Sequence, residues 1–351
     1  MRAFGGSDET WPAVMAPGKA VLAGEYGVLF GSSILAMAVD RYVFMRSAEE
    51  ARERDGEKPA QETDTKNDPL VQCLMEEAAR LTTIPASPPL FDAGELYDDR
   101  GDRLGLGSSA AKAAALFLGA FLLSRDGLDH AAQKAAVFDA ASRAHRLAGG
   151  GSGADVAASV FGGAIRFRLA LRGASSVFEA GVETDNEVEM VSLPERSMPL
   201  LVRGCPPVST REALARLEER TYRRDDRVAG IVEEVTSTGD VLVAALLDER
   251  TEERDLTGAV DASRRALLRL SESLSPEAIS GESALFRAGE VASSFGAAVK
   301  PSGAGGGDLI LVFAPALDPD ERGRLASSLD NAGLPVLDVG LDQVGARPIE
   351  G

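Results

Sequence analysis

The order of apolar and polar positions in the first half of the chain predicts strands joined by glycine-rich turns, followed by helices. Val14–Phe30 has short apolar runs interrupted by glycine and proline, which predicts a strand, a turn and a second strand. Ser33–Arg46 is rich in β-branched and aromatic residues and predicts a pair of strands. Ala48–Pro69 is polar and charged, so we expect a solvated loop there. The other elements expected in this half are helices over Leu70–Leu81, Ser108–Leu123 and His130–Leu147, and strands over Ala164–Leu171 and Glu187–Leu193.

A change of pattern near Pro194–Pro207 indicates a domain boundary. Four prolines punctuate this segment, and charged helices are then expected from Arg211 to about Leu274. We place the boundary after residue 198, which gives an N-terminal domain of residues 1–198 and a C-terminal domain of residues 199–351. The later elements predicted are helix Glu282–Phe295, strand Leu309–Phe313, helix Asp318–Ala332 and strand Pro335–Val339. This order predicts an α+β second domain with a small antiparallel sheet.

Composition narrows the possible functional classes. The 351 residues are 44% hydrophobic and 26% charged, which is typical of a soluble globular protein. Asp and Glu total 55 against 37 Lys and Arg, and the resulting formal net charge of −18 disfavours binding to nucleic acid or to an anionic membrane surface. The two Cys and two His lack zinc or haem spacing. Because neither a signal peptide nor a spanning segment is expected, we predict a cytoplasmic protein, monomeric or homodimeric.

The segment LGLGSSAAK, which begins at Leu104, has the composition of a phosphate-binding turn. Gly105 and Gly107 allow backbone conformations that other residues resist, and Ser108 and Ser109 stand where the next helix is expected to begin. Free N–H groups and the helix dipole attract phosphate oxygens at such a place, and a serine hydroxyl can ligate a phosphate-bound Mg²⁺. A capped helix after a tight turn would use the same residues, so this segment alone leaves both interpretations open.

A second glycine-rich stretch, Gly149–Gly163, contains a single acidic residue, Asp155. A carboxylate among small residues is expected to be partly desolvated and to need a cationic partner. We choose Lys19 as that partner, because it lies in another glycine-proline turn and the chain has few lysines. Such a pair could orient a substrate hydroxyl and accept its proton during phosphoryl transfer. Asp155 could also cap a helix beginning near Val156, and the two roles are compatible.

The third glycine-rich loop, Pro301–Asp308, has four glycines in the five positions from Gly303 to Gly307. Successive N–H groups in such a run can form an anion-binding concavity. A connection from a helix to a strand normally needs only one or two glycines. The length of the run therefore predicts that a ligand approaches the backbone closely.

Together, three ordered motifs give a specific resemblance. Ala16–Gly31 (APGKAVLAGEYGVLFG), Gly105–Ala111 (GLGSSAA) and Ser302–Gly307 (SGAGGG) resemble those of the galactokinase, homoserine kinase, mevalonate kinase and phosphomevalonate kinase (GHMP kinase) superfamily. The motifs spread over most of the chain. The resemblance implies an α+β fold of two domains, with ATP and the acceptor in the cleft between them. The N-terminal domain would be like the second domain of ribosomal protein S5, and the C-terminal domain would be ferredoxin-like.

The same resemblance implies roles for individual residues. Asp155 would take the proton of the acceptor hydroxyl, and Lys19 would stabilise the transferred charge, so these two are the candidate catalytic residues. The implied ATP-binding residues are Gly105, Leu106, Gly107, Ser108, Ser109 and Ala110, with Ser109 also holding Mg²⁺. The implied acceptor-binding residues are Glu25, Tyr26, His145, Ser152, Gly153, Ser302, Gly303, Ala304, Gly305 and Gly306. For Glu25 and Tyr26 a buried pair that fixes the turn is an equally good interpretation, and His145 could be a purely structural residue.

Local features resemble phosphomevalonate kinases more than mevalonate kinases. Tyr26 stands where many mevalonate kinases have His, and His145 lies in a segment where they usually have a metal-ligating Glu. Val156 follows the acidic residue where they typically have Asn, and Lys300 opens the third motif, as is common in phosphomevalonate kinases.

Two positions depart from the phosphomevalonate kinase pattern. Gly150 stands where these enzymes often have Lys, and Leu309 stands where Cys is frequent. One of Arg143, Arg146 or Arg211 could replace the missing lysine, although an arginine on a helix surface is often simply solvated.

The resemblance therefore implies an ATP- and Mg²⁺-dependent kinase that converts the small molecule 5-phosphomevalonate into 5-diphosphomevalonate in the mevalonate pathway of isoprenoid biosynthesis. Mevalonate kinase, or another small-molecule kinase of the superfamily, is the nearest alternative. A non-catalytic ligand sensor on the same fold is a second alternative, against which the retention of Lys19 and Asp155 argues. A decarboxylase of the superfamily would need additional cationic groups around the acceptor.

Overall fold

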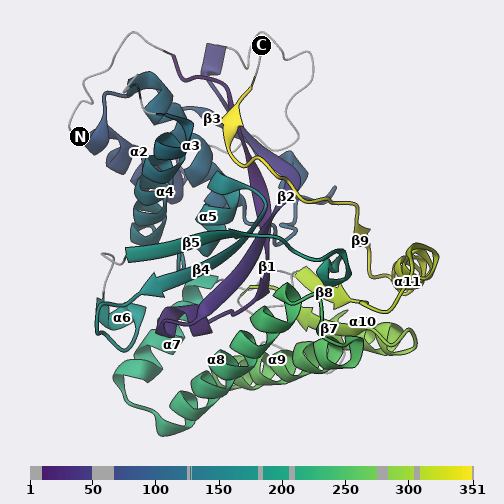
Figure 1. Ribbon diagram of the computed structural model, residues 1–351. Coiled ribbons are helices and arrows are strands. Elements are labelled where there is room, and N and C mark those ends of the chain that lie inside the picture. The colour runs from purple at the N-terminus through teal and green to yellow at the C-terminus, as the bar shows by residue number, and fades with distance from the viewer. Residues whose placement is uncertain are drawn as a thin grey trace.

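The computed structural model describes residues 10–49, 67–124, 127, 129–180, 185–204, 210–274, 284–303 and 309–349. Most of the expected loop Ala48–Pro69 lies outside these ranges, as do Ala304, Gly305 and Gly306 of the third glycine-rich loop. The described chain forms two sheets, each covered by helices (Figure 1). None of the described helices combines the length and apolar character needed to cross a lipid bilayer.

The larger sheet is antiparallel and has the strand order β10-β1-β2-β4-β5, with β3 paired to β2. Its central strands β1 and β2 are buried at most positions on both faces, because helices cover the sheet from both sides. The strands are β1 (Val14–Ala23), β2 (Ser33–Arg46), β3 (Leu90–Asp92), β4 (Ala164–Ala170), β5 (Asp185–Val191) and β10 (Arg347–Pro348).

Two predictions for this sheet are wrong. The segment Val14–Phe30 contains one strand, β1, followed by a 3₁₀ helix η1 (Gly27–Phe30) in place of a second strand. Left-handed backbone at Tyr26 (φ 58°) and Gly31 (φ 84°) flanks this helix. Ser33–Arg46 is one continuous strand, because a register shift opposite Pro17 and Gly18 accommodates the irregular pairing without a turn.

Four helices pack on one side of the larger sheet, and the predicted positions of the first three are confirmed. They are α2 (Pro69–Leu81), α3 (Ser108–Ser124), α4 (His130–Leu147) and α5 (Ala154–Phe161). Helix α3 is alanine- and leucine-rich and almost wholly buried, and it packs against β1 and β2. Asp129 caps α4 by accepting a hydrogen bond from the N–H of Ala132. A short helix, α6 (Val177–Ala180), and the 3₁₀ helices η2 (Gly94–Leu96) and η3 (Glu195–Ser197) complete this part.

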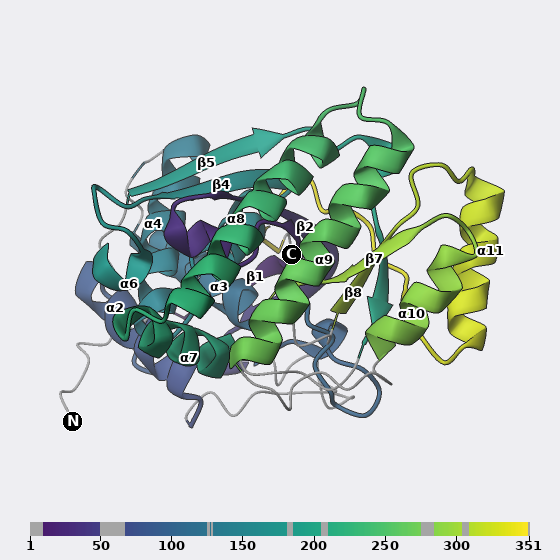
Figure 2. The same ribbon diagram turned by 90° about the horizontal axis from the view of Figure 1, so that it is seen from below.

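The predicted run of charged helices is also confirmed. It consists of α7 (Thr210–Tyr222), α8 (Asp226–Leu247) and α9 (Glu253–Leu274). The long helices α8 and α9 lie side by side (Figure 2). Helix α8 packs against η1 and the larger sheet, whereas α9 packs against β7 of the smaller sheet. These two helices therefore join the cores of the two sheets.

The smaller sheet is antiparallel, as predicted, and has the order β7-β8-β6-β9. Its strands are β6 (Leu200–Arg203), β7 (Ala298–Pro301), β8 (Leu309–Phe313) and β9 (Val336–Leu337), and helices α10 (Ala284–Ser293) and α11 (Pro319–Asn331) pack on it. Alternate residues of β8 enter different cores: Leu311 joins the main core, and Val312 joins the core under α10 and α11. The succession βαββαβ is that of a ferredoxin-like unit.

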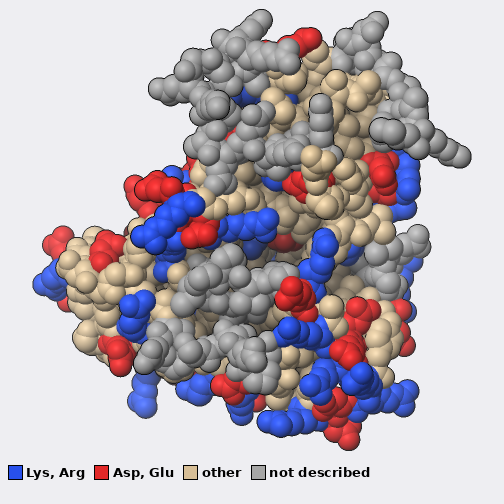
Figure 3. All heavy atoms as spheres, turned by 180° about the vertical axis from the view of Figure 1, so that it is seen from behind, with Lys and Arg blue, Asp and Glu red and all other residues tan. Residues whose placement is uncertain are grey.

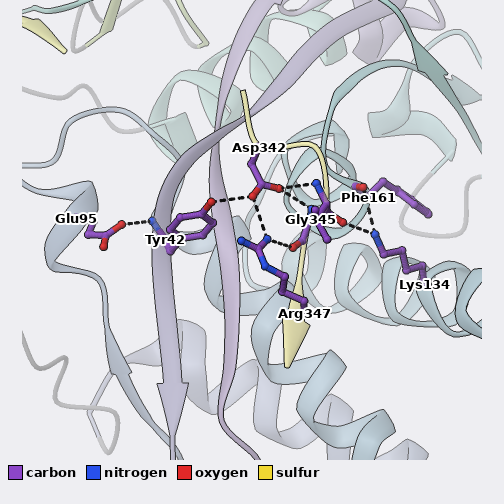
Figure 4. Close-up of polar contacts among 8 residues, drawn as sticks. Tyr42, Glu95, Lys134, Phe161, Asp342, Gly345 and Arg347 are labelled. Atoms are coloured by element: carbon purple, nitrogen blue, oxygen red, sulfur yellow. Dashed lines mark hydrogen bonds and ion pairs between the residues drawn. The ribbon is translucent and has the colours of Figure 1, made fainter. Parts of the chain in front are cut away.

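After β9 the chain returns to the larger sheet, where polar contacts of Asp342 hold it in place (Figure 4). The buried carboxylate of Asp342 accepts hydrogen bonds from the hydroxyl of Tyr42 (2.8 Å) and from the N–H of Gly345, and forms an ion pair with Arg347 (3.0 Å). Burial alone would raise the pKa of Asp342, but these donors outweigh it and hold the pKa below its ordinary value. The final strand β10 is thereby held against β1.

Candidate active site

Lys19 lies directly on the first glycine-rich loop. Its N–H on β1 donates to the carbonyl of Leu106 at 2.8 Å. A Cβ atom added to Gly107 would lie 2.5 Å from Cε of Lys19, and Gly107 has a left-handed φ of +77°. The backbone conformation favours glycine at this position, and any side chain here would have to push the Lys19 side chain away. The structure thus places the side chain of Lys19 against the predicted ATP-binding residue Gly107.

The first loop ends at the N-terminus of helix α3. This helix begins at Ser108, and the N–H groups of Ala110 and Ala111 already donate to the carbonyl of Gly107. The first N–H groups of an α-helix have no intrahelical partner and carry the positive end of its dipole. With Lys19 above Gly107, this end of α3 can bind the oxygens of a phosphate group.

Ser109 contacts His145 at the end of helix α4. Nε2 of His145 lies 3.2 Å from Oγ of Ser109, and the imidazole is buried. In either tautomer of His145 the hydroxyl oxygen of Ser109 retains a free lone pair. Nδ1 of His145 is buried without a hydrogen-bond partner. His145 therefore packs against the first loop. Of the predicted acceptor-binding residues, it is one that the structure places next to the predicted ATP-binding residue Ser109.

The second glycine-rich loop packs against the same imidazole ring of His145. The N–H of Gly150 donates to the carbonyl of His145 at 2.8 Å, and a Cβ atom at Gly150 would collide with Nδ1 of the ring. Any side chain at position 150 would displace His145. The departure from the lysine that phosphomevalonate kinases often have here therefore has a steric reason in this chain.

Asp155 lies in the first turn of α5, and its cationic neighbour is Arg146. Helix α5 begins at Ala154, two residues before the expected start, and Oδ1 of Asp155 accepts from the N–H of Val156 at 3.0 Å. None of the ion pairs between described residues joins Asp155 to Lys19, the predicted partner. Burial lowers the pKa of the Arg146 guanidinium, and the nearby charges of Asp139 and Asp155 oppose that shift.

Two arginines support the second loop from opposite ends. Nη1 of Arg146 donates to the carbonyl of Ser152 at 3.1 Å and lies beside Gly153, the residue before α5. Nη2 of Arg211, from α7, donates to the carbonyl of Ala148. Of the three arginines proposed to replace the missing lysine, Arg146 and Arg211 reach the loop, whereas Arg143 is exposed on α4. Cationic groups therefore surround this loop.

The third loop follows β7 of the smaller sheet, and its first residues are hydrogen-bonded to β1 of the larger sheet. The hydroxyl of Ser302 donates to the carbonyl of Val21 at 3.0 Å and accepts from its N–H at 3.1 Å. Gly303 follows with a left-handed φ of +71°, and no described residue lies within 4 Å of where its Cβ atom would be. The remaining predicted members Ala304, Gly305 and Gly306 lie outside the described residues.

Glu25 has a buried cationic partner. Nζ of Lys300, which is fully buried on β7, forms an ion pair with Oε1 of Glu25 and donates to the carbonyl of Pro301 at 2.7 Å. Burial and the charge of Glu25 raise the pKa of the neighbouring Tyr26 hydroxyl. The structure therefore favours the interpretation in which Glu25 and Tyr26 fix the turn after β1. Sequence analysis does not identify Lys300 as the partner of Glu25, because nothing local relates the two positions.

The donor set suits Mg²⁺ bound together with phosphate. Among the described residues, no three His, Cys, Asp or Glu side chains form a group that could hold a metal by themselves. Mg²⁺ usually takes one or two protein oxygens and completes its coordination with phosphate oxygens and water. The hydroxyl of Ser109, with its free lone pair, and the carboxylate of Asp155 are oxygen donors of the required kind.

Comparison with solved structures finds the same architecture over nearly the whole chain. A Lin0012 protein from Listeria innocua aligns with 97% of this chain and 100% of its own, at a TM-score of 0.72 and 20% identity. The phosphomevalonate kinase of Streptococcus pneumoniae, in complex with phosphomevalonate and AMPPNP, aligns over 94% and 99%, at a TM-score of 0.65 and 18% identity. The mevalonate kinase of L. major, in complex with R-mevalonate, aligns over 98% of both chains, at 0.61 and 14%.

At the level of sequence, no protein-family model matches the chain, and no curated protein matches it. The shared architecture covers both sheets and the helices between them. The chain therefore has the two-domain α+β fold of the GHMP kinases.

Proposed function

We propose that the protein transfers the γ-phosphoryl group of ATP to a small molecule, and that this acceptor is 5-phosphomevalonate. The observation that carries the proposal is the position of Lys19, whose side chain lies on Gly107 at the N-terminus of α3. A cation above a glycine-rich helix N-terminus is suited to the phosphates of a nucleotide. The phosphomevalonate kinase of S. pneumoniae, which has the same fold, was solved with a nucleotide analogue.

In this proposal ATP supplies the phosphoryl group, and Mg²⁺ neutralises charge on its phosphates. The hydroxyl of Ser109 and the carboxylate of Asp155 would hold the metal. The ammonium group of Lys19 and the free N–H groups at the start of α3 would bind the phosphate oxygens. His145 keeps the Ser109 hydroxyl in place through its 3.2 Å contact.

The transfer breaks the bond between the γ-phosphorus and the β–γ bridging oxygen, and it forms a bond from the γ-phosphorus to an oxygen of the acceptor. ADP then leaves. A phosphate monoester is already largely ionised near neutral pH, so this acceptor needs little help from a base. Its approach to ATP brings two anions together, and cationic groups must offset their repulsion. Arg146 and Arg211 at the second glycine-rich loop, with Lys19, are suited to that task.

The direct test is an acceptor screen. ADP release is measured for 5-phosphomevalonate, mevalonate and other small hydroxyl compounds under identical ATP and Mg²⁺ concentrations. We expect the highest kcat/KM with 5-phosphomevalonate. Preference for mevalonate would assign the mevalonate kinase reaction instead, and binding of ATP without turnover of any acceptor would favour a sensor.

A further inference from the structure

A crevice of about 350 Å³ between the segment 100–103 and one end of the smaller sheet is lined by four arginines. Arg100 and Arg103 lie on the hairpin that leads into the first glycine-rich loop, and a bridge between Tyr97 and Arg103 closes that hairpin. Arg203 ends β6, and Arg287 lies on α10. Figure 3 shows Lys and Arg side chains, interspersed with Asp and Glu, on the face where the lobe of α10 and α11 meets the rest of the molecule.

Three of the four guanidinium groups form no ion pair with any described residue. Arg203 is paired with Asp98 and, at 3.4 Å, with Asp102, whereas Arg100, Arg103 and Arg287 have no carboxylate within 4.0 Å in the described chain. The protein has 55 acidic against 37 basic residues, so arginines that line one crevice without an ion pair among the described residues are unexpected. Asp98, the partner of Arg203, also interacts electrostatically with Arg100. Their mutual repulsion is relieved when an anion binds among them.

The lining of the crevice indicates the class of anion. Guanidinium groups bind phosphate through two parallel hydrogen bonds, and several of them together favour a multiply charged group. Leu334, Pro335 and Ala284 add apolar surface, and the volume is that of a small-molecule site. Among the described residues of the lining, Asp102 is the one carboxylate. We propose that this crevice is a second anion site, which binds a small molecule bearing a phosphate or diphosphate group.

The crevice is distinct from the phosphoryl-transfer site described above, because none of Lys19, Ser109 and Asp155 lines it. It is nevertheless connected to that site through the chain, since Arg103 lies two residues before Gly105. A phosphate-bearing ligand here is either a separate effector or the part of a reactant that lies farthest from the transferred group. Anion binding itself does not depend on the proposed function.

The test uses inorganic diphosphate as the probe and calorimetric titration of the full-length protein. Arg287→Ala and Arg100→Ala remove exposed arginines without an ion pair, and Arg254→Ala, at an exposed position near the start of α9, is the matched control. We expect each crevice substitution to weaken diphosphate binding about tenfold and the control to leave it unchanged. The titrations are repeated with a non-hydrolysable ATP analogue and Mg²⁺ present, so that nucleotide competes at the first loop.

Equal affinities for Arg287→Ala, Arg254→Ala and the unchanged protein would overturn the proposal, as would loss of diphosphate binding when the analogue is present. Steady-state assays then separate the two ligand sources. A raised KM for the acceptor or ATP in Arg287→Ala identifies a reactant, whereas an unchanged KM with lost sensitivity of the rate to diphosphate identifies an effector. If the protein has no kinase activity, the calorimetric result still stands by itself, so failure of the two proposals is distinguishable.

Discussion

The hydroxyl of Ser302 forms two hydrogen bonds with the backbone of Val21, one to its carbonyl and one from its N–H. Val21 lies two residues beyond Lys19 on β1, and residues spaced by two lie on the same face of a strand. The start of the third glycine-rich loop is therefore fixed relative to Lys19, although the two belong to different sheets. This contact would allow loops from both ends of the chain to act on one ligand, as the proposed function requires.

Replacing Ser302 with Ala should loosen that connection. The loss of two buried hydrogen bonds is expected to lower the free energy of unfolding by about 1–3 kcal/mol and to raise the KM for the acceptor. Denaturant unfolding and steady-state kinetics measure the two effects. Ser293→Ala is the control, because the exposed Ser293 hydroxyl donates only within its own helix. A KM equal to that of the control would show that Ser302 does not position the loop.

The buried Lys300–Glu25 pair should be a strong determinant of stability. Lys300→Met leaves the Glu25 carboxylate buried without a partner, which should lower the free energy of unfolding by about 3–5 kcal/mol. Adding Glu25→Gln to that variant removes the uncompensated charge and should restore much of the loss. Thermal or denaturant unfolding of the two variants measures the free energy of unfolding that each has lost. A double variant no more stable than Lys300→Met would mean that charge pairing is not the cause.

Asp342 should make stability depend on pH in the acid range. Its pKa is lowered in the folded protein, so its contribution is complete above the ordinary value of 3.8 and is lost as the pH falls through the lowered folded value. Asp342→Asn should therefore lower the free energy of unfolding at pH 7 by about 1–3 kcal/mol and have a smaller effect near pH 3. Unfolding curves at both pH values test this, with the exposed Asp320→Asn as control. An equal loss of unfolding free energy at both pH values would contradict the lowered pKa of Asp342 in the folded protein.

Asp155→Asn tests the chemical nature of the acceptor. With an ionised phosphate acceptor, the substitution should reduce kcat by less than the 10²–10⁴-fold that general-base catalysis typically contributes. Any residual turnover of a hydroxyl acceptor should fall much further in the same variant. Initial rates and ATP affinity are measured together. Complete loss of turnover with unchanged affinity for ATP and with unchanged Mg²⁺ dependence would indicate an essential base, and hence a hydroxyl acceptor.

Local signals were enough for part of the fold. The bounds of α4 and β8 match their predictions, because Asp129 caps α4, Gly149 follows it, and β8 is a continuous apolar run. The four-residue strands β6 and β7 were not predicted, since segments so short carry little periodicity. The boundary after residue 198 remains a prediction, and β10 shows that the end of the chain rejoins the larger sheet.

In the candidate site, the glycine motifs indicated which loops to expect but not which side chains meet. Glu25 and Lys300 are 275 positions apart, and only the packing of the two sheets relates them. The same limit applies to the cation near Asp155. Its single-acid loop predicted a cationic neighbour, and the cation whose charge interacts with Asp155 in the described chain is Arg146, nine residues earlier on α4.

The central claim is that Lys19 on Gly107 forms the phosphoryl-transfer site, and the rate of ADP formation by Lys19→Ala at saturating ATP and 5-phosphomevalonate tests it most directly. We expect kcat to fall about 10²–10³-fold, because a positioned cation that stabilises transferred charge contributes an effect of that size. Lys19→Arg, which keeps the charge, should retain more activity than Lys19→Ala. A kcat for Lys19→Ala within a few-fold of the unchanged protein, with the fold intact, would contradict the account.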